Sequence, residues 1–159
     1  MLQLLRRRLQ GEREGGFTLI ELMVVVLIIA ILIAIAIPTF LGARTRAQNR
    51  AAQASLRNAL VAAKSIYTDT QSYATAESGA TGLPAVEPSL TYKAKGVAST
   101  GQNDISADGS TNAGQWAGAA LSASGTCFWI KDNVSSGTTY GTGPTCTGTA
   151  ALAAAGTSW

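Results

Sequence analysis

The strongest constraint on this chain is an unbroken apolar run near its N-terminus. Leu22 to Ile37 contains sixteen consecutive apolar residues, and the wider segment 17–41 carries a single charge, Glu21. A helix over 17–41, rising about 1.5 Å per residue, is long enough to cross the roughly 30 Å hydrocarbon core of a bilayer. The run is longer than the apolar core of a cleaved secretory signal peptide, and no A-x-A cleavage pattern follows it. A membrane anchor is therefore expected.

Glu21 is the feature that a plain anchor does not explain. A carboxylate at the centre of a bilayer helix costs about 2.5–3.5 kcal/mol. An isolated buried charge tends to become neutral unless a partner compensates it. The segment should therefore meet a cation at some stage.

The charges ahead of the apolar run predict its orientation. Residues 1–16 carry Arg6, Arg7, Arg8 and Arg13 against two glutamates, and the whole chain has a net charge of +3. By the positive-inside rule these arginines place the N-terminus in the cytoplasm. Removing residues 1–16 reduces the net charge to +1, so no basic surface suggests a nucleic-acid partner.

The six residues Gly16-Phe17-Thr18-Leu19-Ile20-Glu21 and the apolar run behind them resemble the class III leader junction and N-terminal helix of type IV pilins. The resemblance implies that a prepilin peptidase cuts after Gly16, on the cytoplasmic side, and methylates the new N-terminus at Phe17. Glu21 then matches the glutamate at the family's fifth mature position, and Pro38 its helix-kinking proline. Ala30 departs from the family, because many members carry glycine there.

The same resemblance implies how the subunit assembles. The cationic amine of Phe17 on one subunit and the Glu21 carboxylate of its neighbour would neutralise each other in a low-dielectric filament core. A pair between Phe17 and Glu21 of one helix is the local alternative. The implied partners are further copies in a helical homopolymer, prepilin peptidase, the pilus assembly platform with minor pilins, and the cytoplasmic membrane before assembly. After assembly the protein would lie in an extracellular pilus.

The helix is expected to continue beyond the membrane, over about Phe17 to Thr70. Apolar residues recur at spacings of three and four on one face: Ala52, Leu56, Leu60, Ala63 and Tyr67. The basic side chains of Arg46, Arg50, Arg57 and Lys64 lie largely elsewhere on the wheel. Proline removes one helical hydrogen bond, so a bend is expected at Pro38.

The remainder of the chain is predicted to be a small β-rich head. Gly79, Gly82, Pro84 and Pro88 mark a loop. Candidate strands follow at Leu90–Ala94, Trp116–Ala123, Thr126–Asp132 and Thr138–Tyr140. The expected fold class is α+β, the pilin fold, in which one long helix with a transmembrane and an amphipathic half packs against a small antiparallel sheet. The expected segments are a removed leader (1–16), a transmembrane and polymerisation helix (17–41), its amphipathic half (42–73) and the head (74–159).

In the third candidate strand, Phe128 and Ile130 should face the helix residues Leu56, Leu60 and Tyr67, and Cys127, Trp129 and Lys131 should face away. The chain's two cysteines, Cys127 and Cys146, are expected to form a disulfide, because the domain should be exported. Its position resembles the family's C-terminal disulfide-bounded region. Trp116, Trp129 and Trp159 are expected to be core or interface anchors.

Several chemistries find no support in the residues. The chain contains no histidine, so a Ser-His-Asp triad cannot form, and neither an enzyme, a cofactor nor a metal is predicted. Asp104 to Gly109 resembles the opening of a calcium loop, but its twelfth position is Gln115 rather than glutamate, which favours a surface turn. Asn133-Val134-Ser135 fits an N-glycosylation sequon, a pattern that is common by chance.

Three functions stay open on the sequence alone. The first is the structural subunit of a type IV pilus that serves adhesion, motility or DNA uptake. The second is a type II secretion pseudopilin, which shares the junction and the long helix. The third is a single-pass membrane-anchored binding domain that never polymerises.

Overall fold

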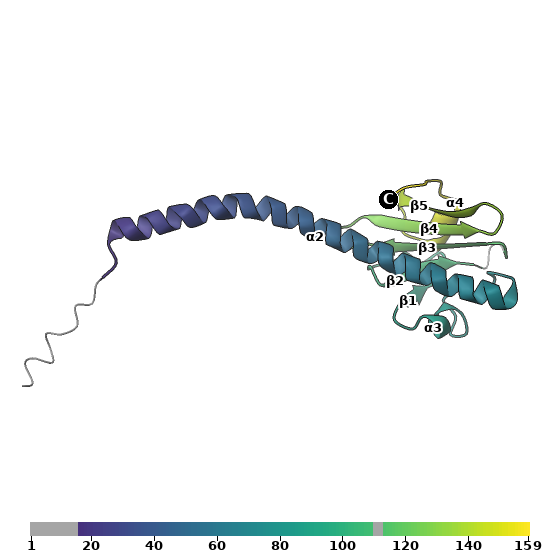
Figure 1. Cartoon of the computed structure of the whole chain (residues 1–159). Coiled ribbons are helices and arrows are strands. Elements are labelled where there is room, and N and C mark those ends of the chain that lie inside the picture. The colour runs from purple at the N-terminus through teal and green to yellow at the C-terminus, as the bar shows by residue number, and fades with distance from the viewer. Residues whose placement is uncertain (1–15, 110–112) are drawn as a thin grey trace, which may run out of the picture. The chain divides into compact units, whose positions relative to one another are not determined.

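The helix that follows the junction is the longest element of the protein. The computed structural model describes residues 16–109 and 113–159. Helix α2 (Leu19–Thr70) begins two residues later than predicted and ends where predicted. The chain divides between Leu41 and Gly42 into two units, and each is described by itself (Figure 1). Pro38 lies inside the helix, and the bend expected there stays a prediction.

In the second unit, five strands follow α2 and form one sheet in the order β1-β2-β3-β4-β5. Their bounds are β1 (Thr91–Lys93), β2 (Asp104–Asp108), β3 (Gln115–Leu121), β4 (Cys127–Asn133) and β5 (Gly137–Gly143). Two short helices accompany them, α3 (Leu83–Val86) and α4 (Gly148–Ala153). The α+β class is confirmed, and the architecture is consistent with the pilin fold.

The sheet is mixed, so the prediction of a wholly antiparallel sheet was wrong. Strands β2 to β5 pair antiparallel, whereas β1 pairs parallel with β2, in the register Tyr92 to Ile105. Residues 94–103 connect the two strands. This connection carries the chain back to the starting end of β1, so that β2 runs in the same direction as β1. No tight hairpin joins them.

The surface turn favoured over Asp104 to Gly109 was also wrong, because these residues form strand β2. The apolar Ile105 and Ala107 alternate with polar residues, and this period of two is a strand signal. The polar residues have partners: Asp104 pairs with Lys93 at 2.7 Å, and Ser106 accepts a hydrogen bond from the Gly148 amide at 2.8 Å. Helix α3 lies inside the predicted loop, where Pro84 falls in its first turn.

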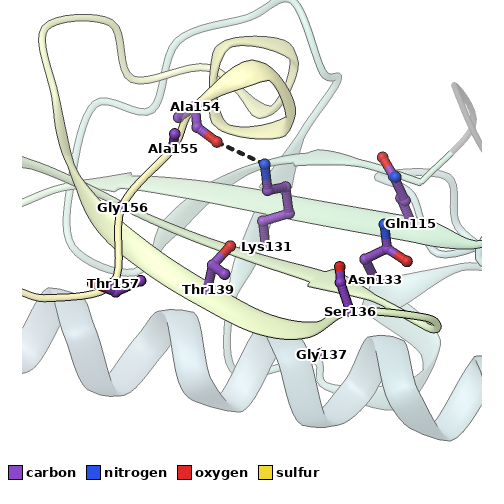
Figure 2. Close-up of a pocket in the computed structure, with 10 residues that line it drawn as sticks. All are labelled: Gln115, Lys131, Asn133, Ser136, Gly137, Thr139, Ala154, Ala155, Gly156 and Thr157. Atoms are coloured by element: carbon purple, nitrogen blue, oxygen red, sulfur yellow. Dashed lines mark hydrogen bonds between the residues drawn. The ribbon is translucent and has the colours of Figure 1, made fainter.

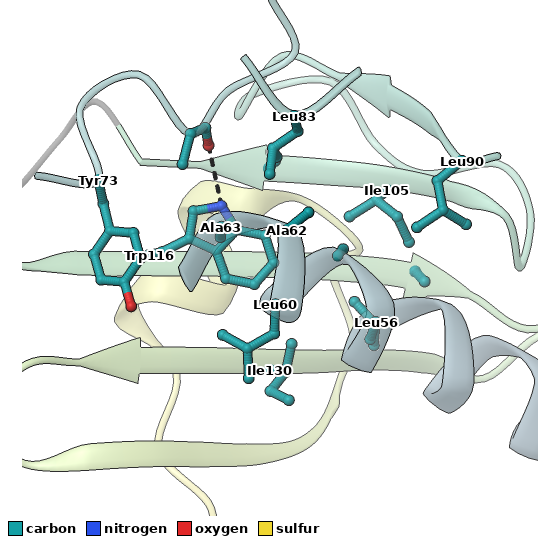
Figure 3. Close-up of a cluster of buried hydrophobic side chains, with 14 of the residues drawn as sticks. Leu56, Leu60, Ala62, Ala63, Tyr73, Leu83, Leu90, Ile105, Trp116 and Ile130 are labelled. Atoms are coloured by element: carbon teal, nitrogen blue, oxygen red, sulfur yellow. Dashed lines mark hydrogen bonds between the residues drawn. The ribbon is translucent and has the colours of Figure 1, made fainter. Parts of the chain in front are cut away.

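Helix α2 covers one face of the sheet and supplies seven of the seventeen described residues that are buried in the main core (Figure 3). Leu56 and Leu60 pack against Phe128 and Ile130 of β4, as the alternation predicted, and Tyr67 packs at the edge of this cluster. Trp116 of β3 is fully buried, and its indole nitrogen donates to the Ala76 carbonyl at 3.0 Å. This bond ties the loop after α2 to the sheet.

The opposite face of the sheet is covered by α4 and by the disulfide between Cys127 and Cys146. Ala117, Ala119 and Trp129 point to this side and form a second, smaller core. Gly141 of β5 lies opposite Trp129, where a Cβ atom would come within 2.6 Å of the indole ring. The glycine therefore makes room for the tryptophan.

The segment after α4 runs along the outer strand of the sheet. Thr157 forms an isolated parallel bridge with Tyr140 of β5. Trp159 then packs on Phe128 and Tyr140, and its indole donates to the Trp129 carbonyl at 3.1 Å. The Arg57 guanidinium of α2 lies 4.9 Å from the Trp159 ring centroid, at a distance typical of a cation–π contact.

A buried polar network joins α2 to the outer strands. Asp132 of β4 is 5% exposed. Its carboxylate accepts hydrogen bonds from the hydroxyls of Tyr73 (2.6 Å) and Thr138 (2.5 Å) and pairs with Lys64 at 3.0 Å. Burial by itself would raise the pKa of Asp132, but these hydrogen bonds and the Lys64 charge outweigh it and lower the pKa. Burial and the same carboxylate raise the pKa of Tyr73.

This network predicts an acid-sensitive head. A carboxylate whose pKa is lowered by folding stabilises the protein above its unfolded pKa, near 3.9, and the stabilisation disappears as the pH falls toward the folded pKa. The unfolding free energy of the full chain in detergent, from urea titrations followed by tryptophan fluorescence, should therefore fall below about pH 4. Asp132→Asn should lower the unfolding free energy at pH 7 by about 2 kcal/mol and make its decrease below pH 4 smaller.

The exposed Asp69 provides the matched control, because no ion pair of this residue is found in the described part of the chain. Asp69→Asn should leave the profile unchanged. If the unfolding free energy of Asp132→Asn decreases at low pH as much as that of the wild type, the role given to this carboxylate is contradicted.

Candidate functional site

The junction residues form the start of helix α2. Gly16, Phe17 and Thr18 precede the helix, which begins at Leu19. The Thr18 hydroxyl accepts a hydrogen bond from the Glu21 amide at 3.2 Å. The Glu21 carboxylate in return lies 3.5 Å from both the amide and the hydroxyl of Thr18. This reciprocal arrangement is a capping box, which satisfies amides that have no partner within the helix.

The capping box gives Glu21 a local role that the sequence analysis missed. The signal was present, since Thr18-Leu19-Ile20-Glu21 has the S/T-x-x-E spacing directly before an apolar run. A carboxylate in the first turn also interacts favourably with the helix dipole. In the intact chain the Phe17 nitrogen is a peptide amide, so no charged amine competes for Glu21. The pairing predicted for Phe17 and Glu21 belongs to the cleaved protein.

The surface around this box is apolar and open. Phe17 is 81% exposed, and none of the large apolar side chains from Leu19 to Leu41 is buried. Helix α2 contains a stretch long and apolar enough to cross a membrane, with a mean hydropathy of 3.3 over its best window, none of which is buried. A water-soluble fold does not leave so large a continuous apolar surface uncovered. The segment therefore supports membrane anchoring.

The head contains a cavity of about 300 Å³ between the outer face of the sheet and the segment after α4 (Figure 2). Lys131 lies within it, and its ammonium donates to the carbonyls of Leu152 (3.1 Å) and Ala154 (2.6 Å). These carbonyls belong to the last turn of α4 and its C-cap, where a cation interacts favourably with the helix dipole. Lys131 thus holds α4 against the sheet.

The candidate residues of the head belong to the second unit. Cys127 and Cys146 form a disulfide in the head, and Trp116 and Trp129 are buried anchors. Within residues 16–109 and 113–159, no group of three or more His, Cys, Asp or Glu side chains could hold a metal ion. Asn133 uses its side-chain oxygen to accept hydrogen bonds from Ser135, in a local turn.

Comparison with known proteins gives one match. The family model described as the prokaryotic N-terminal methylation motif matches residues 13–37. No curated protein and no solved structure matches the chain. The matched residues include the junction, the capping box and most of the apolar run. Together with the exposed helix and the mixed sheet, this motif supports the assignment of the chain as a type IV pilin-like prepilin.

Proposed function

We propose that the mature protein is the structural subunit of a type IV pilus, polymerised through its N-terminal helix into a cell-surface filament. The observation that carries the proposal is the exposed apolar surface of 17–41, most of which lies within the methylation motif at residues 13–37. Cleavage before the apolar segment leaves it on the mature protein. Its surface is then covered by lipid before assembly and by the helices of other subunits afterwards.

The proposal assigns a role to each part of the chain. Residues 1–16 are a leader that prepilin peptidase removes, and Phe17 becomes the methylated N-terminus. Residues 17–41 anchor the subunit in the cytoplasmic membrane and later pack in the filament, where the Phe17 amine pairs with Glu21 of a neighbour. Residues 42–73 carry the head (74–159) on the amphipathic half of the same helix. The proposed partners are prepilin peptidase, the assembly platform with minor pilins, and further copies of the chain.

The processing site can be tested at Gly16. A bulky residue at this position, as in Gly16→Val, should block the cut, because the peptidase would act on the peptide bond beside it. Mass spectrometry of the membrane fraction should find wild-type protein that starts at N-methylated Phe17 and a Gly16→Val protein that keeps residues 1–16. Mature Gly16→Val protein starting at Phe17 would contradict the assignment.

The charge of Glu21 can be separated from its capping function. Glutamine also completes a capping box, so Glu21→Gln keeps the helix start and removes the charge. If the intersubunit pair drives assembly, Glu21→Gln and Glu21→Ala should both be processed and membrane-bound, and both should give few filaments in the sheared fraction. Normal filament yield from Glu21→Ala would refute the pairing. Normal yield from Glu21→Gln alone would assign Glu21 a capping role only.

Electron microscopy with antibody to this protein separates the pilus from its alternatives. Long labelled fibres on cells that make the protein support the pilus subunit. Mature protein without fibres would favour a pseudopilin, and an uncut N-terminus would favour the non-polymerising anchored domain.

A further inference from the structure

Charges on the second unit are distributed unevenly along α2. From Gly42 to Thr68 the helix carries five basic residues and no acidic one: Arg44, Arg46, Arg50, Arg57 and Lys64. Arg57 contacts Trp159, and Lys64 pairs with Asp132. Arg46 and Arg50 are exposed, and neither belongs to an ion pair within the described residues. The same holds for Arg44, so three exposed arginines of this helix have no anionic partner among the described residues.

The basic residues lie on a defined flank of the helix. At about 100° per residue, Arg46, Arg50, Arg57 and Lys64 fall within about 40° of one another. Since Arg57 and Lys64 contact Trp159 and the β4–β5 region, this flank faces β5. Arg44 does not lie on this flank. It precedes Ala62 by eighteen residues, which is five full turns, so the two residues lie on the same line along the helix, on its other flank.

The other flank carries a groove of about 260 Å³ between α2 and the end of α3. Helix α3 and strand β5 lie on opposite sides of α2 (Figure 1). Val61 (68% exposed) and Val86 (45% exposed) form an apolar part of the groove wall beside the polar Asn58 and Ser65, and Glu87 also lines the groove. The Glu87 carboxylate is oriented by the amide (3.2 Å) and hydroxyl (2.5 Å) of Ser89.

No lysine or arginine of the described residues forms an ion pair with Glu87. The groove therefore combines an apolar part of its wall with an anion that lacks a cation in its own subunit. An arginine side chain matches both parts, because its methylene stem packs on apolar surface while its guanidinium binds a carboxylate. Lysine would fit less well, since its compact ammonium is more strongly hydrated.

We propose that this groove receives Arg46 or Arg50 from a second copy of the chain, with Glu87 as the partner of the guanidinium. The inference rests on the proposed polymer and names one of its side contacts. The two arginines and the groove involve different residues, at different heights along the same helix, so two copies join through different surfaces. Such a heterologous contact repeats without closing and generates a helical filament.

The spacing along the helix fixes the stagger of the two copies. Arg46 and Arg50 lie eleven to fifteen residues before Val61, which is about 15–25 Å along a helix. With parallel helices, the copy that inserts the arginine is displaced by that amount along the axis toward the C-terminal end of its partner's α2. Repetition at a constant stagger is what a filament requires.

Charge reversal tests the contact in cells that make the full chain. Arg46→Glu/Arg50→Glu should lower the sheared filament yield about tenfold, equivalent to about 1.4 kcal/mol per contact, while the mature protein in the membrane stays at the wild-type level. Glu87→Arg should do the same. The combined triple variant should recover much of the yield, because the charges are exchanged rather than lost. Arg44→Glu, the matched control on the groove side, should assemble normally.

Cross-linking tests the same contact without relying on yield. In wild-type background, Arg50→Cys/Asn58→Cys filaments treated with a short bismaleimide should give a ladder of dimers, trimers and higher multimers. Each single variant should give none, because a heterologous contact places different residues opposite each other. Arg44→Cys/Asn58→Cys is the control and should stay monomeric.

The outcomes separate this inference from the function on which it rests. If wild-type cells form no labelled fibres, the proposed function fails. If fibres form and neither the charge reversals nor the cross-linker distinguishes the Arg46–Arg50 flank from Arg44, the side contact is overturned while the pilus stands. A cross-linked dimer from either single cysteine variant would show a symmetric contact and would also overturn it.

Discussion

The structure depends on an apolar helix surface that the chain does not bury by itself. The large apolar side chains of 17–41 remain exposed, while in the second unit α2 places its apolar face on the sheet. The hydrophobic effect penalises such exposure in proportion to its area. The first segment therefore requires another apolar environment, which lipid and then the helices of other subunits would supply in the proposed function.

The elements with a clear period were predictable from the sequence. The 3.6-residue spacing gave the end of α2 at Thr70, and alternation in β4 gave the inward orientation of Phe128 and Ile130. Strand β2 was missed because its aspartates and Gly109 suggested a turn, although Lys93 pairs with Asp104 and Lys95 with Asp108 within the fold. A long-range partner of this kind overrides local propensity.

The candidate site was predictable in its position but only partly in its geometry. The Gly16-Phe17 junction is recognised from adjacent residues, as is Glu21. The role of Thr18 could have been read from its spacing to Glu21. The groove at Val61, Val86 and Glu87 could not be predicted from the sequence, which indicates a loop where α3 lies. The distance between α3 and α2 also depends on how the chain folds back after Thr70.

Charged groups fall into two classes that differ in their surroundings. The carboxylates of Asp132 and Asp104 and the ammonium of Lys131 are engaged inside the head, by Lys64, Lys93 and the end of α4 respectively. Burial raises the pKa of Asp104, but the bonds from Lys93 and Thr100 outweigh it and lower the pKa. These groups specify how the head is put together. Arg46, Arg50 and Glu87, by contrast, form no ion pair among the described residues, and the Glu87 carboxylate bonds only to the neighbouring Ser89.

The bridge between Thr157 and Tyr140 matters for the filament proposed above, in which many copies of the head would lie close together. Strand β5 is the outer strand of the sheet, and an uncovered outer strand is a template for pairing with another chain. The Thr157–Trp159 segment lies along it, and the opposite outer strand, β1, has only three residues. In the proposed filament, where many heads would surround a common axis, these two features would protect the heads from joining edge to edge.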